Sequence, residues 1–288
     1  MIRIVEEPEE TGKKFRGFMR LIDEKNLFII CLRKGLIMRI VSGIRQYYRK
    51  RRHRKQFAAD CSRYSSMNND ISFQINPDNV MPAYEEEAQA GSLDEHYFLQ
   101  DIWMARQIRL RGVREHYDVG SRIDGFIAHL LSMDIEVTLI DIRCLDIQMN
   151  NLKFQQGDAT DLSGFADNSV LSLSSLHAIE HFGLGRYGDE IDPYAWKKVL
   201  HSFERVLAKN GILYISVPVG ERNHVVFNAH RVFAPQSIIA EVSGMELVKF
   251  AYIENYKVHE IEDFDLIDSQ MAGKDYLCGC FVFRKKWY

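Results

Sequence analysis

From residue 116 onward the chain alternates short apolar runs with amphipathic stretches. Such alternation of strands and helices is typical of an α/β fold, in which helices cover both faces of a mostly parallel sheet. A helix at 97–111 is expected just before the first strand. The pattern predicts strands at 116–119, 136–140, 152–156, 170–174, 211–217, 245–253 and 277–285, and helices at 125–133, 145–150, 193–207 and 235–242.

The N-terminal part has a different pattern. Apolar residues recur at three- and four-residue steps from Leu36 to Tyr48, which predicts one face of a helix. Residues 33–55 also hold ten Lys and Arg and no acid. A basic helix of this kind could lie on an anionic membrane surface or bind an anionic glycolipid, or it could pack its apolar stripe on the protein. Nucleic acid is the less favoured partner.

A polar stretch at 62–94 contains Asn-Pro, Met-Pro and Gly, which interrupt regular secondary structure, so this stretch is predicted to be an irregular linker. We therefore expect two parts, a basic helical segment with its linker at 1–95 and an α/β domain at 96–288. The overall formal charge of -3 conceals this local asymmetry.

Five cysteines without metal-ligand or disulfide-framework spacing indicate a reducing compartment. The N-terminus lacks the layout of a secretory signal, and the apolar run at 27–32 is far shorter than the roughly 20 residues that cross a membrane. We expect a cytoplasmic protein, with peripheral contact to the inner face of the membrane left open.

The end of the first strand carries the first candidate site, Asp118-Val-Gly120-Ser121-Arg-Ile-Asp-Gly125. Ligands of open parallel sheets bind beyond the carboxyl ends of the strands, where a glycine turn lets the backbone approach closely. Two acids follow in register. Asp141 ends the second strand, where a carboxylate can accept both ribose hydroxyls, and Asp158 follows the third, where an acid can contact an adenine amino group. Each could instead be a cap or turn residue.

Two later segments resemble the class I, Rossmann-like S-adenosylmethionine (SAM) methyltransferase superfamily. Ser-Ser-Leu-His177-Ala-Ile-Glu180-His181-Phe-Gly is similar to its "vlEH" segment, and Glu-Arg-Val-Leu207-Ala-Lys-Asn210-Gly to its "RVLkpGG" turn. The resemblance implies SAM as cofactor, a seven-stranded sheet and a hairpin at one sheet edge. It also implies a set of cofactor-contacting residues, namely Asp118, Gly120, Ser121, Gly125, Asp141, Ile142, Asp158, Ala159 and Leu176.

The chain departs from that superfamily at three glycines. Arg122 and Asp124 stand where the second and third glycines of the first turn are expected, and Asn210 replaces a glycine of the later turn. Tyr97-Phe-x-Gln-Asp-x-Trp103, followed by the Asp118 segment, resembles more narrowly an uncharacterised methyltransferase-like family of unknown function. Its bacterial members imply a link to surface polysaccharides.

Histidines beside the expected methyl position suggest the chemistry. Methyl transfer to a hydroxyl needs a base near neutral pH, and imidazole suits that pKa. The candidate catalytic residues are His177, His181, Glu180 and His230, although substrate binding or loop anchoring is favoured for His230-Arg231. The acids at 189, 190 and 192 are better explained as a solvated loop than as a metal site, so no metal is expected.

The function that these features predict is SAM-dependent O-methylation of a glycan or glycolipid precursor. Two alternatives remain, a binding or scaffold protein that has lost catalysis and a nucleotide-sugar enzyme on the same fold. A nucleic-acid methyltransferase is disfavoured, because the Asn-Pro-Pro-Tyr type of motif is absent after the fourth strand.

Overall fold

The computed structural model describes residues 34–78, 80–81, 91 and 93–286, and for residues 34–46 it describes the backbone alone. The apolar run at 27–32 and Arg33 lie outside the described residues. The chain divides into two compact units, Met1–Ala90 and Gly91–Tyr288.

The first unit contains a long helix, α3 (Lys34–Met67), and a short 3-10 turn, η1 (Ile71–Phe73). The predicted basic helix is confirmed, but the prediction that irregular chain begins at residue 62 is wrong. No glycine or proline interrupts residues 62–67, and the helix ends at Met67, directly before Asn68, whose amide donates to the carbonyls of Asp70 and Phe73. Among the described residues, no helix is both long and apolar enough to cross a membrane.

An eight-stranded sheet forms the centre of the second unit, in the order β3-β2-β1-β4-β5-β10-β8-β9. The first five strands in this order are parallel, and β10 runs antiparallel to both of its neighbours. This arrangement confirms the expected Rossmann-like class I fold. The strands are β1 (Glu115–Val119), β2 (Glu136–Asp141), β3 (Leu152–Gln156), β4 (Val170–Leu176), β5 (Leu207–Val219), β8 (Met245–Glu254), β9 (Lys257–Ile261) and β10 (Leu277–Lys285).

The expected count of seven strands is wrong by one. Strand β9 pairs with β8 and extends the sheet edge, and the two are joined by Asn255 and Tyr256, both with positive φ. Positive φ at both turn residues matches the right-handed twist of a tight hairpin. A second, separate hairpin, β6 (His224–Val226) and β7 (His230–Val232), lies in the expected loop after β5.

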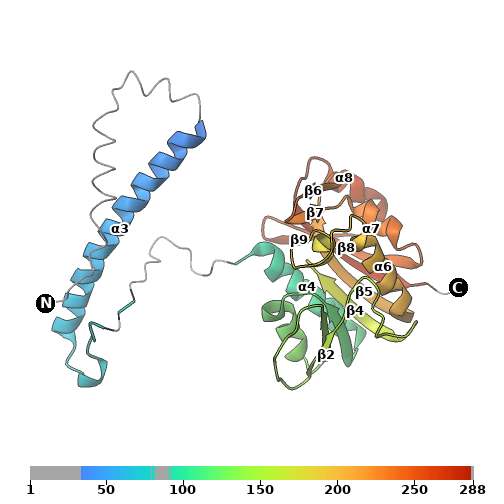
Figure 1. Ribbon diagram of the computed structural model, residues 1–288, viewed down its shortest axis with the longest axis horizontal. Coiled ribbons are helices and arrows are strands. Elements are labelled where there is room, and N and C mark those ends of the chain that lie inside the picture. Colours follow the sequence, from blue (N-terminus) through green and yellow to red (C-terminus); the bar gives the residue numbers. More distant parts are fainter. Residues whose placement is uncertain (1–33, 79, 82–90, 92, 287–288) are drawn as a thin grey trace. The chain divides into compact units, whose positions relative to one another are not determined.

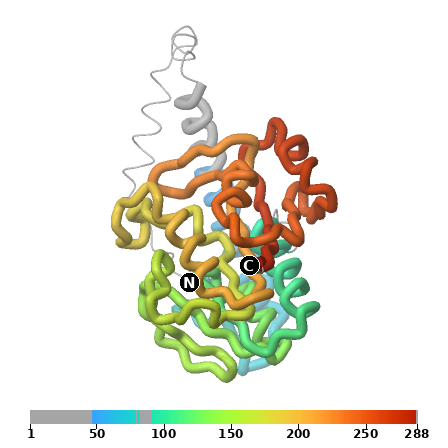
Figure 2. Tube along the Cα trace, turned by 90° about the vertical axis from the view of Figure 1, so that its right-hand side faces the viewer, coloured from blue at the N-terminus to red at the C-terminus, as the bar shows by residue number. Residues whose placement is uncertain are grey.

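Helices cover both faces of the sheet, as expected (Figure 1). The helix α4 (Glu95–Arg111), the π-helical turn η2 (Ile123–Ile127) and α5 (Ala128–Leu131) pack in one apolar cluster. The helices α6 (Ala195–Val206), α7 (Pro235–Glu241) and α8 (Ile267–Met271) pack in another. In Figure 2 the green and yellow first half of this unit lies below the orange and red second half, in keeping with the strand order.

Two helix predictions need correction. Residues 145–150 form no helix, because residues 146–150 are exposed and bury no apolar face that would stabilise one, and Asn151, with φ 62°, turns the chain into β3. The helix expected at 125–133 begins earlier, at Ile123, as the π-turn η2 and ends at Leu131. Helix α4 starts at Glu95 because Asp94 accepts hydrogen bonds from the backbone N–H groups of His96 and Tyr97.

Candidate functional site

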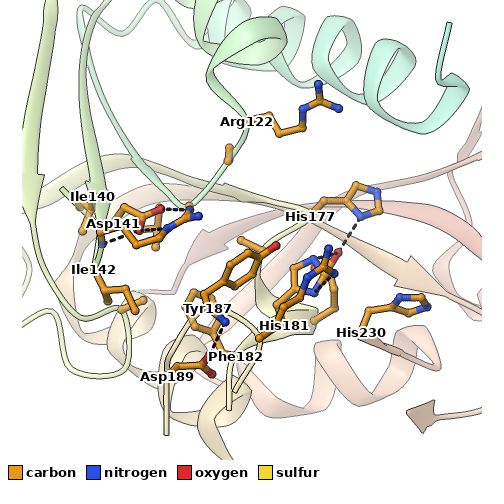
Figure 3. A pocket seen from close by; sticks show the side chains of 18 of the residues that line it. Arg122, Ile140, Asp141, Ile142, His177, His181, Phe182, Tyr187, Asp189 and His230 are labelled. Carbon is orange, nitrogen blue, oxygen red and sulfur yellow. Dashed lines mark hydrogen bonds and ion pairs between the residues drawn. The ribbon is translucent and has the colours of Figure 1, made fainter. Parts of the chain in front are cut away.

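A cavity of about 590 Å³ opens at the carboxyl ends of β1, β2 and β4. Its size is within the range of small-molecule and cofactor sites. Figure 3 shows Asp141 and Ile142 at one end of this cavity and His177, His181 and His230 at the other, with Tyr187 between them. We call these the donor end and the acceptor end.

The turn after β1 depends on one glycine. Gly120 has a φ of 70°, and a Cβ at this position would lie 3.1 Å from the Cβ of Ala178. Arg122 stands where a second glycine was expected, but its φ of -69° suits any residue. It forms a 2.7 Å ion pair with Asp124 and lies 4.7 Å from the centre of the Tyr97 ring. The missing glycine at 122 therefore leaves the turn unstrained.

Asp118 and Leu176 lie beneath this turn and do not line the cavity. The buried Asp118 carboxyl accepts hydrogen bonds from the Ser121 hydroxyl at 2.6 Å, the Ser121 N–H at 3.1 Å and the Ser174 hydroxyl. Burial raises the pKa of Asp118 to about 6. The Ser121 hydroxyl also accepts the N–H of Leu176 at 2.8 Å. These residues hold the turn in place, and Ser121 itself reaches the cavity.

Gly125 serves packing against α4. A Cβ on Gly125 would lie 2.1 Å from a carboxyl oxygen of Asp101. Asp101 is buried and hydrogen-bonds the backbone of Phe126, and its burial raises its pKa to about 6. The two motifs that together suggested a narrow family resemblance, around residues 97–103 and 118–126, are therefore in direct contact.

At the donor end, Asp141 faces the cavity but is already engaged. Arg143 donates to its two carboxylate oxygens from Nε at 2.9 Å and from Nη2 at 2.7 Å. Burial would raise the pKa of Asp141, but the hydrogen bonds from Arg143 outweigh it and hold the pKa below its usual value. Arg143 also lies 4.8 Å from the centre of the Tyr187 ring. This pairing of Arg143 with Asp141, which we call the clamp, was not predicted. The signal for it in the sequence was a basic residue two positions after the acid.

Asp158 does not line the cavity. Its exposed side chain accepts hydrogen bonds from the N–H and the hydroxyl of Thr160, both at 2.8 Å. This is the local turn role that was kept as an alternative. Its neighbours Gly157 and Ala159 do line the cavity, as does Ile142.

At the acceptor end, His177 and Glu180 form a buried pair. Nδ1 of His177 lies 2.8 Å from Oε1 of Glu180, with 8% and 1% of the two residues exposed. An ionised carboxylate can only accept, so a neutral His177 carries its proton on Nδ1 and leaves a lone pair on Nε2. Within the described part of the chain, His177 Nε2 and Glu180 Oε2 are buried without a hydrogen-bond partner. Both residues line the cavity, but these two atoms are themselves almost wholly covered by protein.

The other two predicted histidines have different surroundings. His181 bonds the carbonyl of Ala229 through Nδ1 at 2.6 Å, and burial lowers its pKa despite the nearby Glu180. His230 lines the cavity 5.2 Å from the Tyr276 ring, and burial lowers its pKa too. Arg231 is buried and donates to the carbonyl of Phe182 at 2.6 Å, which is the anchoring role considered for it.

Three tyrosines of the cavity wall, Tyr97, Tyr187 and Tyr276, were not predicted. Tyr97 comes from α4 and lies 5.1 Å from His177, measured between ring centres. Tyr276 immediately precedes β10, the antiparallel strand, whose start lies at the edge where the parallel strands end. The hairpin expected at one sheet edge could therefore have pointed to Tyr276, whereas nothing in the sequence pairs Tyr97 with His177.

Two acids of the loop after η3 (Ile179–His181) have local partners. Asp189 accepts the backbone N–H groups of Gly183 at 2.7 Å and Tyr187 at 3.1 Å, and Asp192 pairs with Lys198 at 2.8 Å. In the part of the chain that the structure describes, no group of three His, Cys, Asp or Glu side chains is placed to hold a metal ion.

Residues 149–285, just under half of the chain, match the family model described as Caenorhabditis protein of unknown function, DUF268. The match includes His177, His181 and His230 of the acceptor end but not Tyr97, Gly120 or Asp141. Comparison with curated proteins finds no match.

Several solved structures share the general course of the chain. A protein of Galdieria sulphuraria assigned as a sarcosine dimethylglycine methyltransferase has 17% identity and a TM-score of 0.45, with 65% of this chain and 84% of that chain covered. A SAM-dependent methyltransferase of Methanosarcina mazei has 14% identity and a TM-score of 0.43, covering 61% and 94%. A protein of Bacillus halodurans assigned as a methyltransferase has 15% identity and a TM-score of 0.45, covering 65% and 99%. These similarities are too distant to identify a cofactor or a substrate.

Proposed function

We propose that the Gly91–Tyr288 unit is a SAM-dependent methyltransferase. The observation that carries this proposal is a single cavity with a glycine turn and Asp141 at one end and a buried imidazole–carboxylate pair at the other. Such a cavity can hold a nucleoside cofactor and a second molecule side by side. SAM, when bound, supplies an electrophilic methyl group on a sulfonium sulfur.

The residues of the donor end suit SAM. Gly120 lines the cavity and carries no side chain, so a ligand can approach its backbone there. Asp141 would accept the ribose hydroxyls once Arg143 releases its carboxylate, and Ile142 and Ala159 would flank the adenine. Asp158, which lies outside the cavity lining, is not needed for this assignment.

At the acceptor end His177 is assigned as the general base. Its Nε2 has no protein partner within the described residues, and Glu180 holds its Nδ1. The base would accept the proton of an attacking hydroxyl, which is typically worth about 10² to 10⁴ in rate. Alignment of the two reactants in one buried cavity would supply a further several kcal/mol, roughly, of barrier lowering.

We propose a hydroxyl of a sugar or of a glycolipid precursor of surface polysaccharide as the acceptor. The polysaccharide part rests on the family resemblance of the sequence. Hydroxyl attack is supported by the His177 imidazole, whose Nδ1 is held by Glu180, and sugar binding by the Tyr97 and Tyr276 rings that line the acceptor end.

Calorimetric titration with SAM and S-adenosylhomocysteine tests the cofactor. We expect micromolar binding by the full chain and a loss of about tenfold or more in Asp141→Ala, since hydrogen bonds to charged groups contribute roughly 1.5 to 3 kcal/mol. Absence of binding by the wild-type protein would refute the proposal. Tight competition by UDP- or GDP-sugars would instead identify a nucleotide-sugar enzyme.

One observation favours a second candidate, a binding protein of the same fold without turnover. Arg143 engages both oxygens of Asp141, which a ribose would need. This candidate predicts that SAM binds weakly or binds without producing S-adenosylhomocysteine in the presence of glycolipid acceptors. Product formation at a rate above that of heat-treated protein would exclude it.

For the first unit we propose contact with an anionic membrane surface through α3. Residues 49–52, 54 and 55 are basic and exposed. Each basic residue near an anionic surface contributes about 1 kcal/mol. The full chain should co-sediment with phosphatidylserine vesicles at low salt, and the triple variant Arg49→Glu, Lys50→Glu and Arg51→Glu should not. Equal sedimentation of both proteins would contradict the proposal.

A further inference from the structure

An exposed apolar hairpin stands at the acceptor end of the cavity. Strands β6 and β7 pair with each other outside the main sheet. Around their turn, Val225, Val226 and Phe227 are 53%, 45% and 71% exposed. Three adjacent apolar side chains left in water on a small hairpin are unfavourable unless they bind something.

The strand register connects this hairpin to the cavity wall. Val226 is directly opposite His230 in the β6–β7 pair, so their side chains lie on the same face of the hairpin. His230 lines the cavity, as Figure 3 shows, and Val226 therefore continues the same wall outward. Phe227 follows at the turn.

The turn of the hairpin is also hydrogen-bonded to two residues that line the cavity. The carbonyl of Ala229, in its turn, accepts a hydrogen bond from Arg186 at 2.9 Å and lies 2.6 Å from Nδ1 of His181. Both partners line the cavity. A ligand that contacts His181 and His230 is thus held within reach of the apolar turn.

The rings around this end are uncharged near neutral pH. Burial lowers the pKa of His96, His181 and His230, and burial raises the pKa of Tyr276 to about 12. The His96 and Tyr276 rings stack at 5.5 Å, and Tyr276 is 46% exposed beside the cavity. From His177 outward, the wall changes from a proton acceptor to neutral rings and then to aliphatic and phenyl groups.

We infer that the acceptor is an amphiphile, whose hydroxylated head enters the cavity toward His177 while its apolar chain lies along Val226 and Phe227. This inference rests on the proposed function and decides between its two acceptor classes, excluding free sugars in favour of sugars attached to an acyl, alkyl or prenyl chain. A polar head with an apolar tail matches the order of groups along the wall. A second copy of the chain or a protein partner would cover the apolar turn but would leave His177 without a hydroxyl.

The test is calorimetric titration of the full chain with methyl, hexyl and octyl β-glucoside, each below its micelle concentration. The affinity should increase with chain length, at most about fourfold per buried methylene, and octyl glucoside should bind at least tenfold more tightly than methyl glucoside. The double variant Val226→Ser and Phe227→Ser should lose at least tenfold of octyl glucoside affinity. The control Leu110→Ser, which replaces a 72% exposed apolar residue of α4, should keep it.

Three results would overturn the inference. The first is a glucoside affinity that does not depend on chain length, and the second is a chain-length dependence that persists in the double variant. The third is a wild-type dimer, seen by sedimentation, that dissociates in the double variant while the octyl glucoside affinity stays unchanged. Titration of the same proteins with S-adenosylhomocysteine separates this inference from the proposed function. If wild type and double variant both bind S-adenosylhomocysteine, the methyltransferase proposal stands, whatever the glucoside affinities are. If the wild type does not bind S-adenosylhomocysteine, the methyltransferase proposal is refuted, while the glucoside titrations still test the amphiphile inference.

Discussion

The two ends of the cavity are built on opposite electrostatic principles. At the donor end Asp141 is paired with Arg143 and Asp124 with Arg122, so that each charge has a partner. At the acceptor end a buried carboxylate and imidazole are left with one unpartnered atom each among the described residues, and the surrounding rings are neutral. A partly satisfied buried polar pair is costly unless a ligand completes it.

This difference indicates that the donor end serves cofactor binding and the acceptor end serves the chemical step. The exposed ion pairs of the donor end can exchange for a ligand at little cost, since surface ion pairs contribute only about 0 to 1 kcal/mol. The unpartnered atoms of the acceptor end provide a strong, directed hydrogen-bond acceptor in a low-dielectric site. We therefore expect substitutions at the acceptor end to change turnover, and substitutions at the donor end to change cofactor affinity.

The largest effect is expected from His177→Asn. Asparagine tolerates the positive φ of 49° at this position, so the loop should keep its shape while the base is lost. Methyl transfer from labelled SAM to glycolipid acceptors should fall by about 10² to 10⁴. Binding of S-adenosylhomocysteine should change by less than about threefold.

His181→Asn is the matched control, because Nδ1 of His181 is already bound to the Ala229 carbonyl. Its turnover should fall by less than about tenfold. Equal losses in the two variants would contradict the assignment of His177 as the base.

A second effect concerns the polar layer beneath the donor end. The pKa of Asp118 is about 6 in the folded chain and near 3.8 when exposed, so the folded state binds its proton more tightly. The stabilisation from this group is complete below pH 4 and is lost as the pH rises through 6. Asn cannot titrate, so the free energy of unfolding of Asp118→Asn, relative to wild type, should rise by about 2 to 3 kcal/mol from pH 4 to 7.

Urea unfolding at both pH values measures this difference. The exposed carboxyl variant Asp146→Asn serves as the control and should show no such change. A difference between Asp118→Asn and wild type that does not depend on pH would show that Asp118 is ionised throughout.

Much of the fold followed from the sequence because long buried strands such as β5 contain continuous apolar runs. The pairing of side chains was harder to predict from the sequence. Gly120 could be identified because a turn between strand and helix demands a positive φ there, but the clamp of Arg143 on Asp141 depends on rotamers. Strand β9 was missed because its alternation of polar and apolar residues is short, and the meeting of Tyr276 with His230 depends on sheet order rather than on distance along the chain.

The smallest effect is expected from Arg143→Gln. Removal of the clamp frees the Asp141 carboxylate, so S-adenosylhomocysteine should bind a few times more tightly, in line with the roughly 1 kcal/mol at most of an exposed ion pair. Arg106→Gln, an exposed arginine of α4, is the control. A loss of affinity in Arg143→Gln alone would mean that Arg143 itself contacts the ligand.

The most direct test of the two-ended cavity is a crystal structure of the full chain with S-adenosylhomocysteine. The account predicts the ribose hydroxyls on Asp141, Arg143 turned away from that carboxylate, and the sulfur directed toward His177. A cavity that stays empty at millimolar ligand, or a ligand bound with its adenosine at the His177 end, would contradict it.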